Sequence, residues 1–285
     1  MTSKISISSK LNGLGDSLCS MWCVEGLKQA GMDVDFFVRP EHIGICRLYH
    51  ERVFHKDNAP LDAVTLNISK TETQMAGRPP DNLSRIDWWW GWAEEQYSGE
   101  FPAGATPKKP QLLNPFVLRP ELENTIVIAP ECCFYNRTWN MGHYGRLVHL
   151  LKEAGHEVVA FVEKAESKVN EINGLVYHYG MSFEGLAMAI ASSKLLIGND
   201  SGPAHIAGTV GTPCIPVHAV MPPEAVWNYY SDFFPAYPDD ACAGCGFKAD
   251  RGYHPHTCGK MCSALEGISA GDVFKIAEQA LGQIN

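Results

Sequence analysis

A polar turn between two apolar runs holds the residue types best suited to binding an anion. The apolar run at 195–197 stops at Gly198-Asn199-Asp200-Ser201-Gly202, small residues occupy 203–210, and a second apolar run lies at 214–217. This order predicts a strand, a tight turn, a helix and another strand. Proline at 203 suits the first turn of a helix, and the side chain of Ser201 or Asp200 can cap it. The free N–H groups at such a helix start can hold a phosphate without a lysine.

His205 lies about one turn into the expected helix, close to the same opening. It can serve as a ligand to a bound anion, or it can pack in the core with its ring bonded to the backbone. Asp200 has two similar interpretations, as a ligand or as the residue that orients its own turn. A glycine-rich turn is also common as a plain connector, so these residues need support from the rest of the chain.

Four cysteines crowd into a short region near the C-terminus, and their spacing is typical of a metal site. Two close pairs are separated by a stretch that contains glycines and a proline. Such pairs can converge as a tetrahedral thiolate set that binds zinc, or iron, in a structural role. His254 or His256 could replace one cysteine, and four bystander thiols are the other interpretation. The expected ligands, within a loop at 238–264, are Cys242, Cys245, Cys258 and Cys262.

A second glycine turn, Asn12-Gly13-Leu14-Gly15-Asp16, follows a strand pattern at 4–9 and precedes a helical pattern that closes on Gly31. Asp16 is its carboxylate. A carboxylate here can act as the general base for an incoming hydroxyl, or it can cap the helix that follows. The two roles are compatible.

These candidate residues require an α/β framework to bring them together. Strand patterns alternate with helix patterns in both halves, and the second half restarts at 125–129, which predicts parallel sheets covered by helices. Expected elements include a helix over 41–50 and a short strand over 174–177. A proline-rich stretch at 101–120 is the linker candidate. We therefore expect two Rossmann-like domains, 1–118 and 119–285.

Tryptophan occupies positions 88, 89, 90 and 92. Four rings so close in sequence cannot all face one core, so we expect two to pack inside and two to form a surface or a domain contact. A platform on which an acceptor stacks is the alternative.

Composition narrows the function classes. The chain has 285 residues, of which 45% are hydrophobic, and a formal net charge of −9. No apolar run approaches the roughly 18 residues of a membrane span, and the N-terminus lacks the apolar core of a secretory signal. The acidic balance argues against a general binder of nucleic acid or anionic membranes. A cytoplasmic protein is expected, with buried free thiols at Cys19, Cys23, Cys46 and Cys214.

The turn and its helix, Asp-Ser-Gly-Pro-Ala-His-Ile-Ala followed by Gly-Thr-Pro over 200–213, resemble the nucleotide-sugar-binding signature of glycosyltransferase family 9, the heptosyltransferase family. The resemblance extends to Gly13-Leu14-Gly15-Asp16-Ser17-Leu18, to Ile128-Ala129-Pro130-Glu131, to Asn136-Arg137-Thr138-Trp139 and to 180–187. It covers the second half in order, plus the first 30 residues. The fold it implies is GT-B, with two Rossmann-like domains facing each other across a cleft.

The resemblance also implies roles for individual residues. The catalytic residues would be Asp16, as the base for the acceptor hydroxyl, and His205, as an assistant to the leaving group. An acidic residue that follows a strand holds the nucleotide ribose in this family, and here Glu163 is favoured over Glu166. The donor-binding residues would be Arg137, Glu163, Asp200, Ser201 and Gly202.

The function so implied is transfer of a sugar from a nucleotide-diphosphate sugar, with inversion and without a catalytic divalent metal. ADP-linked heptose is the family's commonest donor, and the acceptor hydroxyl could belong to a glycan, a protein or a modified nucleobase. Two other interpretations remain: a non-catalytic subunit that binds sugar nucleotides, and a metal-thiolate redox or sensor protein centred on the cysteines. Replacement of Asp16 separates the enzyme from the first alternative, and nucleotide affinity separates it from the second.

Overall fold

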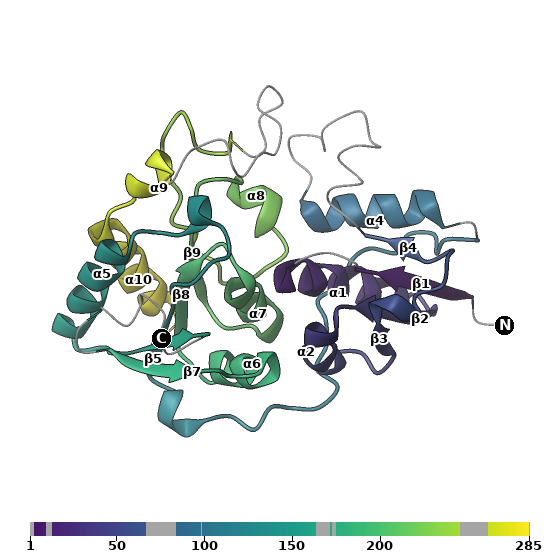
Figure 1. Ribbon diagram of the computed structural model, residues 1–285, viewed down its shortest axis with the longest axis horizontal. Helices are drawn as coiled ribbons and strands as arrows, with labels where there is room; N and C mark the ends of the chain where they lie inside the picture. Colours follow the sequence, from purple (N-terminus) through teal and green to yellow (C-terminus); the bar gives the residue numbers. More distant parts are fainter. Residues whose placement is uncertain are drawn as a thin grey trace. The chain divides into compact units, whose positions relative to one another are not determined.

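The computed structural model describes residues 3–9, 13–66, 84–97, 99–163, 172, 175–245 and 262–284. The chain divides between Pro115 and Phe116 into two compact units. Each unit is an α/β fold with its own parallel sheet (Figure 1). Among the described residues, none of the helices is both long and apolar enough to cross a bilayer.

Unit 1, residues 1–115, is built on a sheet with the strand order β3-β2-β1-β4, and all its neighbouring strands run parallel. Ile7 of β1 lies beside Phe36 of β2 and Val64 of β4, so apolar side chains line up across the sheet. The strands are β1 Lys4–Ser8, β2 Asp33–Val38, β3 Val53–His55 and β4 Val64–Thr65.

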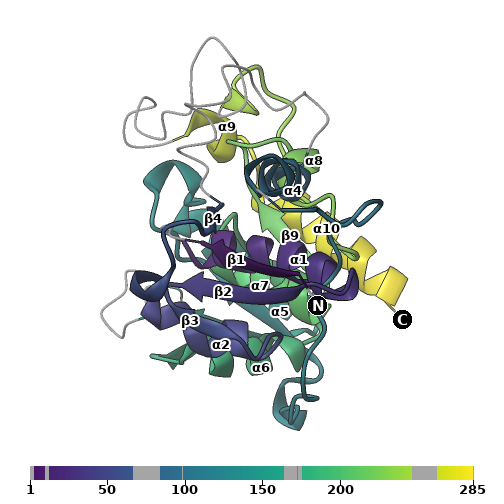
Figure 2. The ribbon, with the colours of Figure 1, turned by 90° about the vertical axis from the view of Figure 1, so that its right-hand side faces the viewer.

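The helices of unit 1 are centred on α1, which contacts both α2 and α4 (Figure 2). α1 ends just before Gly31, whose φ of 87° suits glycine and turns the chain into β2. The helix expected over 41–50 is shorter, because tighter bonds from the N–H groups of Leu48 and Tyr49 end it early. The bounds are α1 Leu14–Gln29, η1 Pro40–His42, α2 Ile43–Arg47, η2 Lys56–Asn58 and α4 Arg85–Gln96.

Helix α4 carries the tryptophan cluster and buries every member of it, Trp88, Trp89, Trp90 and Trp92. The expectation of rings on the surface is therefore wrong, and the alternative of a domain contact stays a prediction. Two of the partners precede and follow the helix in sequence. The Trp92 indole donates to the carbonyl of Thr65, and Trp90 meets Phe101 edge to face with ring centroids 5.3 Å apart. The extended segment after α4 thus covers a ring that the sequence pattern left exposed.

Unit 2, residues 116–285, has a fully parallel sheet in the order β7-β6-β5-β8-β9. The short strand expected at 174–177 is found at Val176–Tyr179, because Val176 pairs with Val159 and Tyr179 with Val162 at the end of β6. The partner strand decides this register, and the local pattern does not. The other strands are β5 Thr125–Ala129, β6 Glu157–Val162, β8 Leu195–Asn199 and β9 Cys214–Val217.

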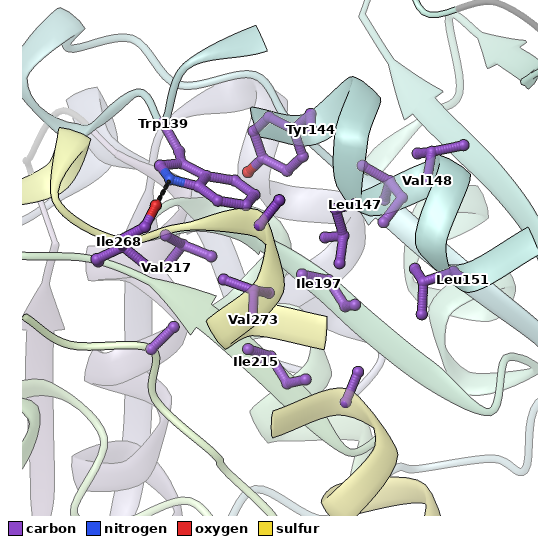
Figure 3. Close-up of a cluster of buried hydrophobic side chains, with 14 of the residues drawn as sticks. Trp139, Tyr144, Leu147, Val148, Leu151, Ile197, Ile215, Val217, Ile268 and Val273 are labelled. Atoms are coloured by element: carbon purple, nitrogen blue, oxygen red, sulfur yellow. Dashed lines mark hydrogen bonds between the residues drawn. The ribbon is translucent and has the colours of Figure 1, made fainter. Parts of the chain in front are cut away.

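The helices of unit 2 form two pairs, α5 with α10 and α6 with α7. The main core lies where α5 and α10 pack on the sheet, and Trp139 sits over it (Figure 3). The bounds are η3 Pro120–Leu122, η4 Tyr135–Arg137, α5 Met141–Glu153, α6 Phe183–Ala191, α7 Gly202–Val210, α8 Pro223–Val226, α9 Ser263–Glu266 and α10 Ala270–Ile284.

The thiols expected in apolar surroundings are buried, as predicted: Cys19, Cys23, Cys46 and Cys214. Burial raises the pKa of Cys23 and of Cys214, so neither is a ready nucleophile at neutral pH.

Candidate functional site

The loops that follow β5, β6 and β8 leave the sheet of unit 2 at one edge, because the strands are parallel. Ala129 of β5 pairs with Gly198 of β8, so the segments after these two residues begin side by side. One of these segments carries Arg137, and the other carries Asp200 and Ser201. The sheet therefore brings together two stretches that are about 60 residues apart in sequence.

Ser201 holds the N-cap position of α7, but its side chain makes no capping bond. The predicted capping role is wrong for a local reason. Pro203 has no N–H, and the N–H of Ala204 donates to the carbonyl of Ser201 itself at 3.1 Å. Ser201 Oγ is consequently buried without a hydrogen-bond partner among the described residues. The helix start offers fewer backbone donors than usual, and this hydroxyl is in a position to add one.

Arg137 ends the short helix η4 and lies against Asp200. Its Nη1 is 3.6 Å from Asp200 Oδ2, and its guanidinium also covers the ring of Phe134 at 5.3 Å from the centroid. Asp200 is 2% exposed, and the side chain of Arg137 is 13% exposed. A buried carboxylate is stable in a fold only with such a partner. The pair places a planar cation, the geometry that suits phosphate oxygens, beside the start of α7.

His205 is buried inside an aromatic cluster. Its Nδ1 is 3.0 Å from the hydroxyl of Tyr230, and its ring packs against Trp227 with centroids 4.8 Å apart. Only 2% of the residue is exposed. Of the two interpretations offered by the sequence, this geometry resembles the core histidine, with a tyrosine hydroxyl in place of a backbone partner.

Glu163 follows β6 directly and is exposed at the same edge. Its backbone N–H donates to Glu131 Oε2 at 2.5 Å. Glu131 lies two residues after β5, so the bond joins the ends of two neighbouring strands. Sequence reasoning assigned no role to Glu131 beyond its place in the family motif, and no local signal marks this contact. Glu166, the alternative to Glu163, lies outside the described residues.

In unit 1, Asp16 lies in the first turn of α1, with its side chain 20% exposed. Its Oδ1 is 3.4 Å from Nη1 of Arg85, whose side chain is 11% exposed. Arg85 is the first residue of α4, and a reciprocal capping box between Ser84 and Asp87 fixes that helix start. The Ser-x-x-Asp spacing signals the helix start in sequence, but nothing local shows that Arg85 meets Asp16.

The neighbour of Asp16 in α1, Ser17, forms a buried pair with His42 of η1. The hydroxyl of Ser17 lies 2.9 Å from Nδ1 of His42, which ends the turn after β2. Burial lowers the pKa of His42 to about 4, with Arg39 adding to the effect and Glu41 opposing it. His42 is therefore neutral at pH 7, and Ser17 can donate to it. This pair ties α1 to the end of β2.

Three of the four predicted metal ligands lie in the described part of the chain, and Cys258 lies outside it. Cys262 is buried in the core of unit 2, and Cys242 packs against the same core. Among the described residues no group of three or more histidines, cysteines or carboxylates is arranged to hold a metal ion. His254 and His256 also fall outside the described residues.

One comparison with known proteins identifies a family. Residues 98–232 match the family model described as glycosyltransferase family 9 (heptosyltransferase). The chain carries a glycosyltransferase family 9 domain. Its enzyme class is therefore glycosyltransferase. A search of curated proteins finds no match.

Solved structures of this family share the fold of the chain. The iron-containing dodecameric glycosyltransferase TibC from enterotoxigenic E. coli has a TM-score of 0.75 at 14% identity, covering 100% of this chain and 78% of TibC. A family 9 glycosyltransferase from Veillonella parvula has a TM-score of 0.70 at 15% identity, covering 99% and 98%. The E. coli heptosyltransferase WaaC, solved with ADP-2-deoxy-2-fluoro heptose, has a TM-score of 0.64 at 13% identity, covering 97% and 99%. Two Rossmann-like units of the GT-B type are thus the architecture of this chain.

Proposed function

We propose that the protein transfers a sugar from a nucleotide-diphosphate sugar to an acceptor hydroxyl, with inversion and without a catalytic divalent metal. The observation that carries the proposal is the meeting of Arg137, Asp200 and Ser201 at the start of α7, inside the segment that matches the family. An ADP-linked heptose is the favoured donor, because TibC and WaaC were solved with ADP-heptose compounds.

The chemistry needs charge stabilisation at the departing diphosphate. Hydrogen-bond donors that already point at the place where charge develops usually contribute most to the acceleration of such a reaction. Arg137 supplies a planar guanidinium cation, Ser201 supplies its hydroxyl group, and Gly202 supplies the first backbone N–H of α7. His205 is proposed to assist by fixing the helix from within, since its ring is buried against Trp227.

Asp16 is proposed to accept the proton of the acceptor hydroxyl. The guanidinium of Arg85 lies 3.4 Å from Asp16 Oδ1 and orients this carboxylate in the first turn of α1. The acceptor is proposed to be a hydroxyl of a glycan, a protein or a modified nucleobase.

Glu163 is proposed to bind the ribose hydroxyls of the donor. Its carboxylate is exposed at the edge where the diphosphate is proposed to lie, and carboxylate oxygens accept hydrogen bonds from a diol. The bond from its backbone to Glu131 holds the start of that loop in place.

The four cysteines, Cys242, Cys245, Cys258 and Cys262, are proposed to hold a structural zinc or iron ion. Support comes from their spacing and from TibC, which is described as iron-containing. Four protein ligands leave no open position for substrate, so the ion is proposed to be structural and no catalytic step is assigned to it. A cytoplasmic location is likewise proposed from the cysteine usage.

A panel of ADP-, UDP- and GDP-sugars, with mass detection of the glycosylated product and calorimetry of donor binding, tests the proposal. Asp16→Asn should lower transfer by about 10²-fold or more while ADP still binds. Asp62→Asn, at an exposed carboxylate of the same unit, is the matched control and should leave both unchanged. Full transfer by Asp16→Asn would contradict the base assignment. Absence of affinity for every nucleotide sugar would contradict the enzyme proposal and restore the metal-thiolate alternative.

A further inference from the structure

Asn199, the last residue of β8, is fully buried and makes three side-chain hydrogen bonds. Its Nδ2 donates to the carbonyl of Pro130 at 2.6 Å. Its Oδ1 accepts from the backbone N–H of Trp139 at 2.8 Å and from the hydroxyl of Tyr144 at 3.1 Å. One amide therefore binds the chain at two points that enclose residues 131–138.

We call residues 131–138 the donor loop, because they carry Arg137. Pro130 is the residue just before this loop, and Trp139 is the residue just after it. The loop leaves from the end of β5 and returns to the start of α5. Asn199 holds both ends of the loop close together through these hydrogen bonds.

Two further contacts hold the loop, one to the segment before α10 and one to the residue that follows β8. The indole of Trp139 donates to the carbonyl of Ile268 at 2.9 Å, which anchors the returning end over the core (Figure 3). Near the other end, the thiol of Cys132 donates to the carbonyl of Asp200 at 3.8 Å. Asp200 is the next residue after Asn199, so the loop is joined to β8 at consecutive positions.

We propose that Asn199 is a positioning residue for the diphosphate group of the donor, acting by holding the donor loop so that Arg137 faces the start of α7. This inference rests on the proposed function. Asn199 and Ser201 are separated by one residue, so the same stretch of backbone sets the helix start and both loop ends. The amide of Asn199 has an NH2 group that donates hydrogen bonds and an oxygen that accepts them. The carbonyl of Pro130 requires the first, and the N–H of Trp139 requires the second.

Asn199→Leu removes all three hydrogen bonds while keeping the number and branching of side-chain heavy atoms, and Asn199→Asp removes the donation to Pro130 while keeping an acceptor for Trp139. Calorimetry with ADP should show affinity lowered by about tenfold or more in the leucine variant and by less in the aspartate variant. Competition with adenosine, which lacks phosphates, should show little change. A merely structural defect would weaken both ligands together.

A second readout follows the loop without any ligand. Cys133 is exposed, whereas Cys132 is partly buried and burial raises its pKa to about 11. Iodoacetamide labelling with peptide mass spectrometry should therefore modify Cys133 in the wild type and spare Cys132. In Asn199→Leu, labelling of Cys132 should increase several-fold under conditions where the variant remains folded.

Two controls separate positioning from stability. Tyr144→Phe removes one bond to Asn199 but leaves both loop ends held, so ADP affinity should match the wild type. Ser193→Ala removes a buried bond to the carbonyl of Ile190 away from the loop, and it should lower the melting temperature without changing ADP affinity or Cys132 labelling.

The inference is overturned if Asn199→Leu keeps wild-type ADP affinity and Cys132 protection, or if Ser193→Ala reproduces its losses. If Asn199→Leu cannot be obtained folded, wild-type values in Asn199→Asp overturn it. Failure of the wild type to bind ADP would count against the proposed function, and Cys132 labelling would still decide whether Asn199 holds the loop.

Discussion

The ion pair between Arg137 and Asp200 can be tested by a double-mutant cycle, because it should contribute to stability and, by the proposed function, to binding of the sugar nucleotide. The perturbations are Arg137→Met, Asp200→Asn and the two together. Nη1 and Oδ2 are 3.6 Å apart, which corresponds to about 5 kcal/mol of attraction at an effective dielectric constant near 20. Desolvation offsets part of this, and breaking a buried pair from one side typically costs about 3–5 kcal/mol.

Arg137→Met leaves a carboxylate that is 2% exposed without its cation, so we expect a loss of about 3 kcal/mol. In the double variant that carboxylate has become a neutral amide, and the loss should be smaller than the sum of the single losses by about 2 kcal/mol or more. In thermal unfolding of a unit this size, the single arginine change corresponds to a shift of about 6–12 °C. A coupling below about 0.5 kcal/mol would refute the pair as a stabilising interaction.

Calorimetry with ADP on the same variants separates binding from stability. Arg137→Met should weaken ADP binding by at least about tenfold, the effect of losing a hydrogen bond to a charged group. Asp200→Asn removes a negative charge next to the diphosphate, so ADP should bind as well as in the wild type or more tightly. Loss of ADP binding in Asp200→Asn with no loss in Arg137→Met would reverse the assigned roles.

Three further predictions address pH, packing and metal. Burial is the main reason why the pKa of His218 is lowered to about 4, from an unfolded value near 6.5. Unit 2 should therefore lose stability as the pH falls from 6.5 to 4, by about 3 kcal/mol at the lower end. His218→Gln should flatten an acid-unfolding curve in this range. Gly26→Ala forces a methyl group against the backbone carbonyl of Thr106 and should destabilise unit 1 by about 1–3 kcal/mol in urea unfolding, and an unchanged midpoint would contradict the contact. Cys245→Ser should lose the metal measured by mass spectrometry, and Cys133→Ser should retain it; equal metal in both would exclude the proposed ligand.

Several elements were predictable because their signals are local. The apolar runs at 125–129 and 195–197 begin the strands β5 and β8, and the small-residue segment after Gly202 forms α7. The thiols in apolar patterns are buried. Each of these follows from side-chain period and turn residues, which act over a few positions.

One wrong prediction has a local cause, and two have causes far away in the sequence. Ser201 does not cap α7, since Pro203 and Ala204 leave it no N–H to accept from. The tryptophans of α4 are all buried because a later segment covers part of the helix. The short strand lies two residues further along than expected, because its pairing with β6 sets the register.

The sequence by itself indicated the family, the alternation of strands and helices in both halves, and the two glycine turns that carry Asp16 and Asp200. These depend on residue type and spacing, which are readable along one chain. Tertiary structure alone decided that Arg85 meets Asp16, that Arg137 meets Asp200, and that Asn199 holds both ends of the donor loop. Each of these contacts joins segments about 60 to 70 residues apart, and parallel strand pairing, which no local pattern encodes, brings the two in unit 2 together.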